Sequence, residues 1–315
     1  MNISVVVVTY NRLPLLQRAI QAIESQTRTP YAMIVVDNCS TDSTAEFLSD
    51  WLIQQTGCLK QVVSLPHNMG GSGGFHHGLK AAMALDSDWI WLADDDAFPC
   101  PDAFERFNGH QEAYAAQCVS PARPLGVVCS TVLNEGAIDE IHRRRAYCKH
   151  GFTLRARSVS QCEYAKGIFP IDLFTYVGVF IKREVLNKVG ITEKDYFIWY
   201  DDSEHAMRIA KHYSILCDAS IKIHHNVPAV PNQMSWKTFY GERNRLLMFK
   251  KHHYPTYLYR LLKTWIYILG IGAPANPRMK QLKWRAMWAA ILNQQGVHAQ
   301  YRPGSKVLWK VRTSP

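Results

Sequence analysis

Short apolar runs alternate with amphipathic stretches over the first hundred residues. Four runs predict buried strands, at residues 3–8, 33–36, 62–65 and 89–92. The stretches between them place apolar residues at helical spacing, over residues 15–23, 40–52 and 75–85. Apolar strands that alternate with helices are typical of a parallel sheet covered on both faces. We therefore predict an α/β fold with a doubly wound, mostly parallel sheet.

Polar side chains stand where these strands end. Asn11 follows the first strand, Asp37 the second, Asn68 the third, and an aspartate triplet at residues 94–96 the fourth. Ligands of such sheets bind at the carboxyl ends of the strands. The sequence therefore predicts a ligand site built from these residues.

Beyond residue 100 the hydrophobic pattern is weaker. Residues 100–175 are rich in small, basic and turn residues, and we assign them only loosely. A strand is predicted at 177–181, a short helix at 183–189, a helix that begins at Asp201 and Asp202, and a strand at 219–223 that ends in His224 and His225. Further helices are predicted at 236–251 and 255–269.

Charge divides the chain of 315 residues. The whole sequence carries 36 Lys and Arg against 26 Asp and Glu, a net charge of +10. Residues 1–235 have a net charge of −4, whereas residues 236–315 have a net charge of +14 and one acid, Glu242. We therefore predict a main domain over 1–235, with halves of about 1–100 and 101–235, and a basic, aromatic, helical C-terminal region over 236–315. The 47% of hydrophobic residues excludes a disordered tail or a disulfide miniprotein.

The N-terminus and the cysteines favour a cytosolic protein. The first residues lack a basic segment, and their apolar run is too short for a signal peptide or a transmembrane helix. The eight cysteines form no C-x-x-C pair, so we expect reduced thiols rather than disulfides or a zinc site.

The aspartate triplet predicts a divalent cation. Adjacent carboxylates repel one another and need a counter-charge, and carboxylate oxygens favour Mg²⁺ or Mn²⁺ held together with substrate phosphates. A solvated acidic turn is the alternative. Strand alternation sends His224 and His225 to opposite faces, so one of them is expected to join the site. We favour His225, which shares its phase with Ile221 and Ile223.

Two further segments are candidates for chemistry. The glycine-rich segment 68–74 matches neither the dinucleotide nor the P-loop fingerprint. We predict a loop whose backbone comes close to a bulky ligand, with a purely structural turn as the alternative.

Asp201 and Asp202 are at the start of a helix, whose dipole stabilises carboxylates. One of them is a candidate base for an incoming hydroxyl while a metal handles a leaving phosphate, and Glu204 stands close enough in sequence to orient the acceptor.

In this order and spacing, these segments resemble the inverting glycosyltransferases of the GT-A fold in the large nucleotide-sugar transferase family 2. The segments that carry the resemblance are VVVVTYNR at 5–12, IVVDNCSTD at 34–42, NMGGSGGF at 68–75, ADDDAFP at 93–99, FIWYDDSEHAMR at 197–208 and YGERNRLL at 240–247. The glycine segment, the aspartate triplet and YDDSE most resemble bacterial galactofuranosyltransferases. Rhamnosyltransferases of the family share much of the remainder.

The resemblance implies a Rossmann-like nucleotide-sugar half, an acceptor half and a role for each matching residue. Its donor-binding residues are Thr9, Asn11, Arg12, Asp37, Asn68, Gly70, Gly71, Asp94 and Asp95. Its metal ligands for Mn²⁺ or Mg²⁺ are Asp94, Asp96 and His225 or His224. Its catalytic base is Asp202, with Asp201 and Glu204 beside the acceptor.

The resemblance also implies a reaction. Asp202 removes a proton from the acceptor hydroxyl, whose oxygen displaces the nucleotide diphosphate from the sugar with inversion. UDP-galactofuranose is the expected donor and dTDP-rhamnose the alternative. The expected acceptor is a cell-surface polysaccharide or O-antigen glycan, lipid-linked or free.

Two other classes of function are weaker. A non-catalytic nucleotide-binding module needs neither Asp202 nor a histidine after the last strand. The basic charge suggests a nucleic-acid-binding protein, but no nucleic-acid fingerprint is present, so we expect no nucleic acid partner.

The C-terminal region either packs its aromatic face on the main domain or attaches peripherally to the inner face of the cytoplasmic membrane. Two features favour membrane attachment. The apolar segment 265–273 is too short to span a bilayer, and the cations that flank it can bind anionic lipid headgroups.

Overall fold

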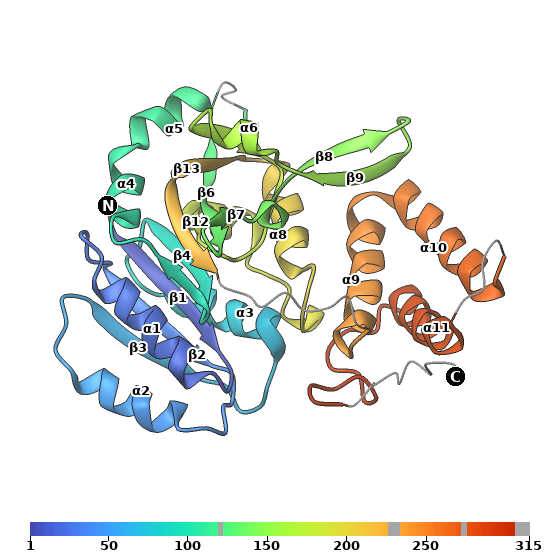
Figure 1. Cartoon of the computed structure of the whole chain (residues 1–315), viewed down its shortest axis with the longest axis horizontal. Helices are drawn as coiled ribbons and strands as arrows, with labels where there is room; N and C mark the ends of the chain where they lie inside the picture. The colour runs from blue at the N-terminus through green and yellow to red at the C-terminus, as the bar shows by residue number, and fades with distance from the viewer. Residues whose placement is uncertain (119–121, 226–233, 272–275, 306–315) are drawn as a thin grey trace.

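A mixed ten-stranded sheet runs through the main domain and carries helices on both faces (Figure 1). The structure, a computed structural model, describes residues 1–118, 122–225, 234–271 and 276–305. The strands of its main path are, in spatial order, β10 (Ile168–Ile171), β13 (Ser214–His225), β6 (Leu125–Asn134), β12 (Val179–Lys182), β4 (Trp89–Asp94), β1 (Ile3–Thr9), β2 (Ala32–Asp37) and β3 (Leu59–Ser64). Two short strands pair off this path, β5 (Ala97–Pro99) with β13 and β7 (Ala137–Ile138) with β6.

The predicted α/β class and mostly parallel sheet are confirmed. Strands β1 to β4 are mutually parallel, as the alternation of strands and helices predicted. On the main path, β12 and β10 run against the other six strands. The carboxyl ends of β1, β2 and β4 therefore meet at one edge, where the polar residues of the sequence pattern gather.

The core lies on both faces of β1, because alternate residues of a strand point to opposite sides. On one face Val5 and Val7 pack with α1 (Leu13–Glu24) and α2 (Thr44–Ile53). On the other face Val6 and Val8 pack with α3 (Gly70–Met83). This two-sided burial explains why β1 is a continuous apolar run instead of an alternating one.

The glycine-rich segment is part of a helix, which corrects the predicted loop. Helix α3 begins at Gly70 and includes the glycines that follow. A Cβ atom at Gly74 would lie 2.3 Å from Cγ1 of Val8, and one at Gly78 would lie 2.3 Å from Cγ1 of Val6. These two glycines therefore serve the close approach of α3 to β1, a long-range contact that the local pattern does not reveal.

In its described residues, the loosely assigned stretch from 100 to 175 contains three helices, a protruding hairpin and several strands. The helices are α4 (Ala103–Gly109) and α5 (Gln111–Gln117), with a short α6 (Gln161–Tyr164) and a 3-10 turn η1 (Glu140–His142). Strands β8 (Arg143–Lys149) and β9 (Thr153–Ser158) form the hairpin, and β11 (Leu173–Phe174) completes a second, three-stranded sheet (Figure 1). Buried Arg143 donates hydrogen bonds to carbonyl oxygens of Ser130 and Val177, which ties the hairpin to the main sheet.

The elements that follow match the predicted pattern closely. Helix α7 (Arg183–Val189) has the predicted bounds, a 3-10 turn η2 (Lys194–Tyr196) follows, and α8 (Asp201–Ala210) begins at the predicted acidic pair. The eight cysteines are all free thiols, as expected.

The described part of the C-terminal region forms three helices, which lie beside the main domain (Figure 1). They are α9 (Lys237–His252), α10 (Tyr254–Leu269) and α11 (Pro277–Ile291), and α9 packs against both of the others. The first two lie where helical periodicity predicted them. The predicted domain boundary at residue 235 adjoins residues 226–233, which are outside the described residues. Among the described residues, no helix is long and apolar enough to cross a membrane.

Candidate active site

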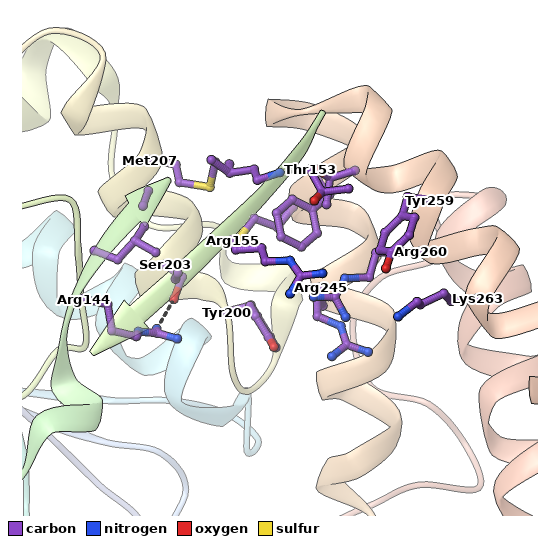
Figure 2. A pocket seen from close by; sticks show the side chains of 17 residues that line it. Arg144, Thr153, Arg155, Tyr200, Ser203, Met207, Arg245, Tyr259, Arg260 and Lys263 are labelled. Carbon is purple, nitrogen blue, oxygen red and sulfur yellow. Dashed lines mark hydrogen bonds between the residues drawn. The ribbon is translucent and has the colours of Figure 1, made fainter. Parts of the chain in front are cut away.

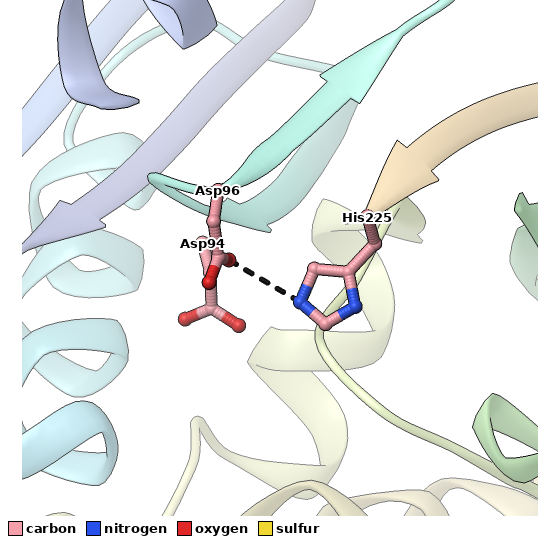
Figure 3. Close-up of side chains that lie close together, drawn as sticks. All are labelled: Asp94, Asp96 and His225. Carbon is pink, nitrogen blue, oxygen red and sulfur yellow. Dashed lines mark ion pairs between the residues drawn. The ribbon is translucent and has the colours of Figure 1, made fainter. Parts of the chain in front are cut away.

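Asp94, Asp96 and His225 meet beyond the carboxyl end of β4 (Figure 3). One ligand atom from each lies within 4.8 Å of the others, and Oδ1 of Asp96 is 3.2 Å from Nε2 of His225. The turn after β4 brings the chain into β5, whose Ala97 pairs with His225 at the end of β13. The pairing of β5 with β13 thus places the histidine beside the aspartates.

The electrostatics of this metal-site cluster fit a divalent cation. Burial, followed by the charges of Asp96 and Asp95, raises the pKa of Asp94 to about 8. Burial also acts on Asp96, but its hydrogen bond and ion pair with His225 bring the net pKa below the ordinary value. Nδ1 of His225 is buried and has no hydrogen-bond partner among the described residues. Two crowded carboxylates and an imidazole with an open lone pair are a donor set suited to Mn²⁺.

His224 does not join this cluster, which corrects the alternative that we left open for the metal. Successive residues of a strand point to opposite faces, and His224 has the phase of exposed Lys222 instead of buried Ile223. Strand register thus separates the two histidines, as the phase argument for His225 anticipated.

A cavity of about 290 Å³ opens beside the metal-site cluster. The predicted donor residues that line it are Thr9, Arg12, Asn68, Gly70, Gly71, Asp94 and Asp95. Tyr10, Asn38, Phe197, Ile198, Trp236 and Lys237 line it as well. We refer to it as the donor cavity, because it holds most of the predicted donor-binding residues.

Thr9 and Arg12 hold the middle aspartate of the triplet. Oγ1 of Thr9 donates a hydrogen bond of 2.8 Å to Asp95. The Arg12 guanidinium bridges Asp95, at 3.2 Å, and Asp96, at 2.8 Å. Burial raises the pKa of Asp95 to about 6 against the opposing effects of these two partners. The carboxylate of Asp95 is thus engaged within the protein, while Asp94 and Asp96 face His225.

Asn11 and Asp37 are not among the residues that line the donor cavity and instead shape the adjoining turn. The backbone N–H of Thr41 donates to the side chain of Asn11 at 2.6 Å, and that of Ser40 donates to Asp37 at 2.9 Å. The next residue, Asn38, reaches the cavity in their place. Its side chain donates to the Gly70 carbonyl oxygen at 2.9 Å and accepts from the Met69 N–H at 2.8 Å.

Asp201 and Asp202 open helix α8, at the end of an unusual backbone turn. Burial raises the pKa of Asp201 to about 8, together with the charge of Asp202. Burial also raises the pKa of Asp202, and the nearby charge of Arg144 opposes this effect. The backbone N–H of Ser203 donates to Asp202, which fixes one of its oxygens. A carboxylate with a raised pKa is suited to accept a proton near neutral pH.

Glu204 is enclosed by protein side chains and is not among the residues that line the donor cavity, so its surroundings differ from the place beside the acceptor that we predicted for it. Its side chain is fully buried and forms ion pairs of 2.9 Å with Arg208, Lys251 and His252. One turn of helix α8 separates Glu204 from Arg208, and the other two partners come from α9. The carboxylate therefore joins two helices, and its charge is already compensated inside the protein.

The N-terminal half of the chain is similar to a known family. Residues 4–157, which contain the donor-side strands and the aspartate triplet, match the family model described as Glycosyl transferase family 2. This match lies in slightly under half of the chain. The match covers β1 to β4, whose carboxyl ends build the donor cavity and the metal-site cluster.

Known proteins similar to this chain agree with the family. It is 40% identical over 207 residues to the galactofuranosyltransferase GlfT1 of Mycolicibacterium smegmatis, an alignment that covers 65% of this chain and 64% of that protein. The chain therefore spans slightly under two thirds of the length of this curated relative.

Solved structures establish the GT-A glycosyltransferase fold. GalNAc-T7 with UDP, GalNAc and Mn²⁺ has a TM-score of 0.58 at 14% identity, covering 93% of this chain and 56% of that one. The mannosyltransferase PcManGT from Pyrobaculum calidifontis, in complex with GDP-Man and Mn²⁺, has a TM-score of 0.53 at 19% identity, covering 92% and 75%.

Several residues beside the candidate site were missed by the sequence patterns. Trp236 and Lys237 line the donor cavity, although they belong to the basic C-terminal region. His142 lies next to His225, with ring centroids 5.1 Å apart. Asn38 had a usable signal, since it directly follows Asp37 at a strand end. Trp236, Lys237 and His142 come close to the site through long-range packing, which leaves no local signal in the sequence.

Proposed function

We propose that this chain is a metal-dependent, inverting glycosyltransferase that transfers galactofuranose from UDP-galactofuranose. The observation that carries the proposal is the meeting of Asp94, Asp96 and His225 beside the donor cavity. The galactofuranosyltransferase name of the relative supports the sugar, and the Mn²⁺ named with the two solved structures supports the metal.

The chemistry is a single displacement for which the chain supplies a base. The carboxylate of Asp202 accepts the proton of the acceptor hydroxyl. The acceptor oxygen forms a bond to the anomeric carbon while the bond from that carbon to the diphosphate breaks, and the electron pair leaves with the nucleoside diphosphate. Asp94, Asp96 and His225 would hold a divalent cation, which when bound would supply positive charge next to the departing diphosphate. Attack from the face opposite the nucleotide inverts the anomeric configuration.

We further propose that the acceptor is a glycan of a cell-surface polysaccharide, such as an O-antigen, and that the protein works at the cytoplasmic face of the membrane. Helix α10 supports this location. Its Leu258, Leu262 and Leu269 are 47%, 59% and 64% exposed, and Arg260 and Lys263 lie on the same helix. An exposed apolar stripe with neighbouring cations is suited to an anionic bilayer surface. Failure of the protein to sediment with phosphatidylglycerol vesicles at low salt would contradict this location.

A panel of donors tests the reaction. The purified protein is incubated with UDP-galactofuranose or dTDP-rhamnose, with Mn²⁺, Mg²⁺ or EDTA, and nucleotide release and product configuration are measured. We expect release from UDP-galactofuranose with a metal, no release in EDTA, and an inverted product. Turnover of dTDP-rhamnose alone would move the assignment to a rhamnosyltransferase. Full activity in EDTA would remove the metal role, and no turnover of either donor would overturn the proposed function.

A further inference from the structure

Lys237, the first residue of helix α9, lines the donor cavity. Figure 1 shows α9 as the helix of the C-terminal region that lies next to the main domain. Residues 4–157, which match the family model, end well before this helix. A side chain from the C-terminal region therefore completes the wall of a cavity whose other residues come mainly from the main domain.

The positive charge of Lys237 is not compensated by a carboxylate of the protein. Two cations are among the described residues that line the donor cavity, Arg12 and Lys237. Arg12 forms ion pairs with Asp95 and Asp96, at 3.2 and 2.8 Å. Lys237 forms none within the described part of the chain, and its ammonium lies 5.7 Å from the centre of the Trp236 ring. The charge of Lys237 is therefore free to bind an anion in this cavity.

The electrostatic surroundings of Lys237 place it near the metal-site cluster. Burial and, to a smaller extent, the charge of Arg12 lower the pKa of Lys237, while the charges of Asp94 and Asp96 oppose this decrease. When a divalent cation occupies the cluster, its charge balances those of Asp94 and Asp96, and Lys237 is left as surplus positive charge. An anionic ligand bound beside the cluster compensates that surplus.

Lys237 is held in position by the packing of its neighbours. The Trp236 ring packs on Phe197 and Tyr240, with ring centroids 6.0 and 5.8 Å apart. The backbone N–H of Ser235 donates to Oγ1 of Thr238 at 3.1 Å, which fixes the start of the helix. Because Lys237 begins a helix of 16 residues, the positive end of the helix dipole adds to its charge. A charge that is fixed in this way stabilises a ligand with little reorganisation.

We propose that Lys237 binds the diphosphate of the nucleotide-sugar donor and stabilises the negative charge that this group gains as its bond to the sugar breaks. This inference rests on the proposed function, because it assigns a residue to the donor side of the same reaction. The nucleoside and the transferred sugar are uncharged, so the diphosphate is the anionic part of the donor. Because its negative charge increases in the transition state, the ammonium of Lys237 binds the transition state more strongly than the intact donor.

Ligand binding tests this contact without catalysis. UDP and uridine are titrated separately into the protein with Mn²⁺, and the heat of binding is measured. We expect Lys237→Met to raise the Kd of UDP by about tenfold or more and to leave that of uridine unchanged, since uridine has no phosphate. Lys237→Arg keeps the positive charge and is expected to bind UDP much more tightly than Lys237→Met. Unchanged UDP binding in Lys237→Met would overturn the proposal, and so would equal losses of UDP and uridine binding, which would show that Lys237 only shapes the cavity.

Two cations outside the donor cavity serve as matched controls for UDP binding. Lys211 is exposed at the end of α8. Arg260 of α10 lines a second cavity, of about 350 Å³, between the hairpin of β8 and β9 and the helices α9 and α10 (Figure 2). Lys211→Met and Arg260→Gln are expected to keep the wild-type affinity for UDP. A loss in Arg260→Gln equal to that in Lys237→Met would assign the effect to the general charge of the C-terminal region and overturn the proposal.

The affinity for Mn²⁺ separates a contact with phosphate from a structural role in the metal site. In the absence of nucleotide, the charge of Lys237 opposes the binding of a cation by Asp94 and Asp96. We therefore expect Lys237→Met to bind Mn²⁺ at least as tightly as the wild type, measured by electron paramagnetic resonance of the free ion. Weaker Mn²⁺ binding in this variant would show that Lys237 supports the metal site itself and would overturn the proposal.

Turnover completes the test. We expect kcat with UDP-galactofuranose to fall about tenfold or more in Lys237→Met, because the departing diphosphate loses a cation, and to stay unchanged in Lys211→Met. A wild-type protein whose UDP binding depends on Lys237 but which turns over no UDP-galactofuranose would overturn the proposed function and leave the contact between Lys237 and the diphosphate in place.

Discussion

At the residue scale, the environment of Asp202 distinguishes it from its acidic neighbours. Glu204 is paired with Arg208 and Lys251 and hydrogen-bonded to His252, and burial together with the charge of Asp202 raises the pKa of Asp201 to about 8. Burial raises the pKa of Asp202, and the nearby charge of Arg144 opposes this effect. Asp202 also directly precedes Ser203, whose side chain accepts a hydrogen bond from Arg144, and it is the residue of this group that we propose to exchange a proton with a substrate.

Replacement of the proposed base tests this assignment. Asp202→Asn keeps the size of the side chain but cannot accept a proton, so we expect the transfer rate to fall at least 100-fold, in line with the usual contribution of a general base of about 10²–10⁴. Binding of UDP, measured by calorimetry with Mn²⁺, is expected to remain close to wild type. Asp50→Asn, at an exposed position of α2, is the control. A normally active Asp202→Asn protein would remove this residue from the role of base.

Gly78 is a residue whose missing side chain has a structural role. A Cβ atom there would lie 2.3 Å from Val6 and 3.0 Å from Val36. We expect Gly78→Ala to lower the free energy of unfolding by about 1–3 kcal/mol, because the overpacking outweighs the better helix propensity of alanine. Urea unfolding followed by circular dichroism measures the change. Gly109→Ala is the matched control, since nothing lies within 4 Å of its Cβ position, and equal effects of the two substitutions would contradict the packing argument.

At the scale of elements, helix α9 fixes the turn that leads into the acidic pair. Phe197, Trp199 and Tyr200 have φ angles of 69°, 66° and 71°, a left-handed conformation that is costly for side chains of this size. Asn244 of α9 donates to the carbonyl oxygens of Tyr196, Ile198 and Trp199, each at 2.9 Å. The C-terminal region thus holds the backbone turn that precedes the acidic pair of the candidate active site.

Removal of this amide tests the coupling between α9 and the site. Asn244→Ala leaves buried carbonyl oxygens without a donor, so we expect a loss of about 2–3 kcal/mol in the free energy of unfolding. We also expect kcat to fall more than tenfold at temperatures where the variant is still folded, because the turn before Asp202 loses its anchor. Gln281→Ala, which removes an exposed amide from α11, is the control. A destabilised variant with unchanged kcat would show that the anchoring has no catalytic role.

At the scale of the whole molecule, a buried ion cluster joins the main domain to the C-terminal region. Glu204 of α8 meets Lys251 and His252 of α9, and Lys251 also pairs with Glu193 at 2.7 Å. Burial raises the pKa of Glu204, but the hydrogen bond from His252 and the charges of Arg208 and Lys251 outweigh this effect and lower it to about 2. The charged form of Glu204 is therefore favoured by folding.

The lowered pKa of Glu204 predicts that the folded protein loses stability in acid. Because the folded-state pKa is lower than the ordinary value of 4.5, Glu204 stabilises the protein fully above about pH 4.5, and this stabilisation is lost as the pH falls toward about 2. A shift of this size corresponds to about 3 kcal/mol. We expect Glu204→Gln to unfold more easily in urea at pH 7 and to show a weaker pH dependence below pH 4.5. Glu184→Gln, at an exposed position of α7, should keep the wild-type profile. An unchanged profile in Glu204→Gln would contradict the role of the cluster.

The sequence by itself determined the features that depend on local periodicity. Apolar runs predicted β1 to β4 and their parallel order, helical spacing placed α7 and α9, and strand alternation selected His225 over His224. These features follow from how neighbouring residues alternate between core and solvent, which the sequence states directly.

Only the tertiary structure decided the features that depend on partners distant in sequence. The glycine segment is a helix because α3 must approach Val6 and Val8 of β1. Glu204 is structural because its partners come from α9, about fifty residues later. The cavity between the β8–β9 hairpin and helices α9 and α10 is lined by residues as far apart in sequence as Arg144 and Lys263. Burial and charge compensation are properties of the assembled surroundings, so no local pattern contains them.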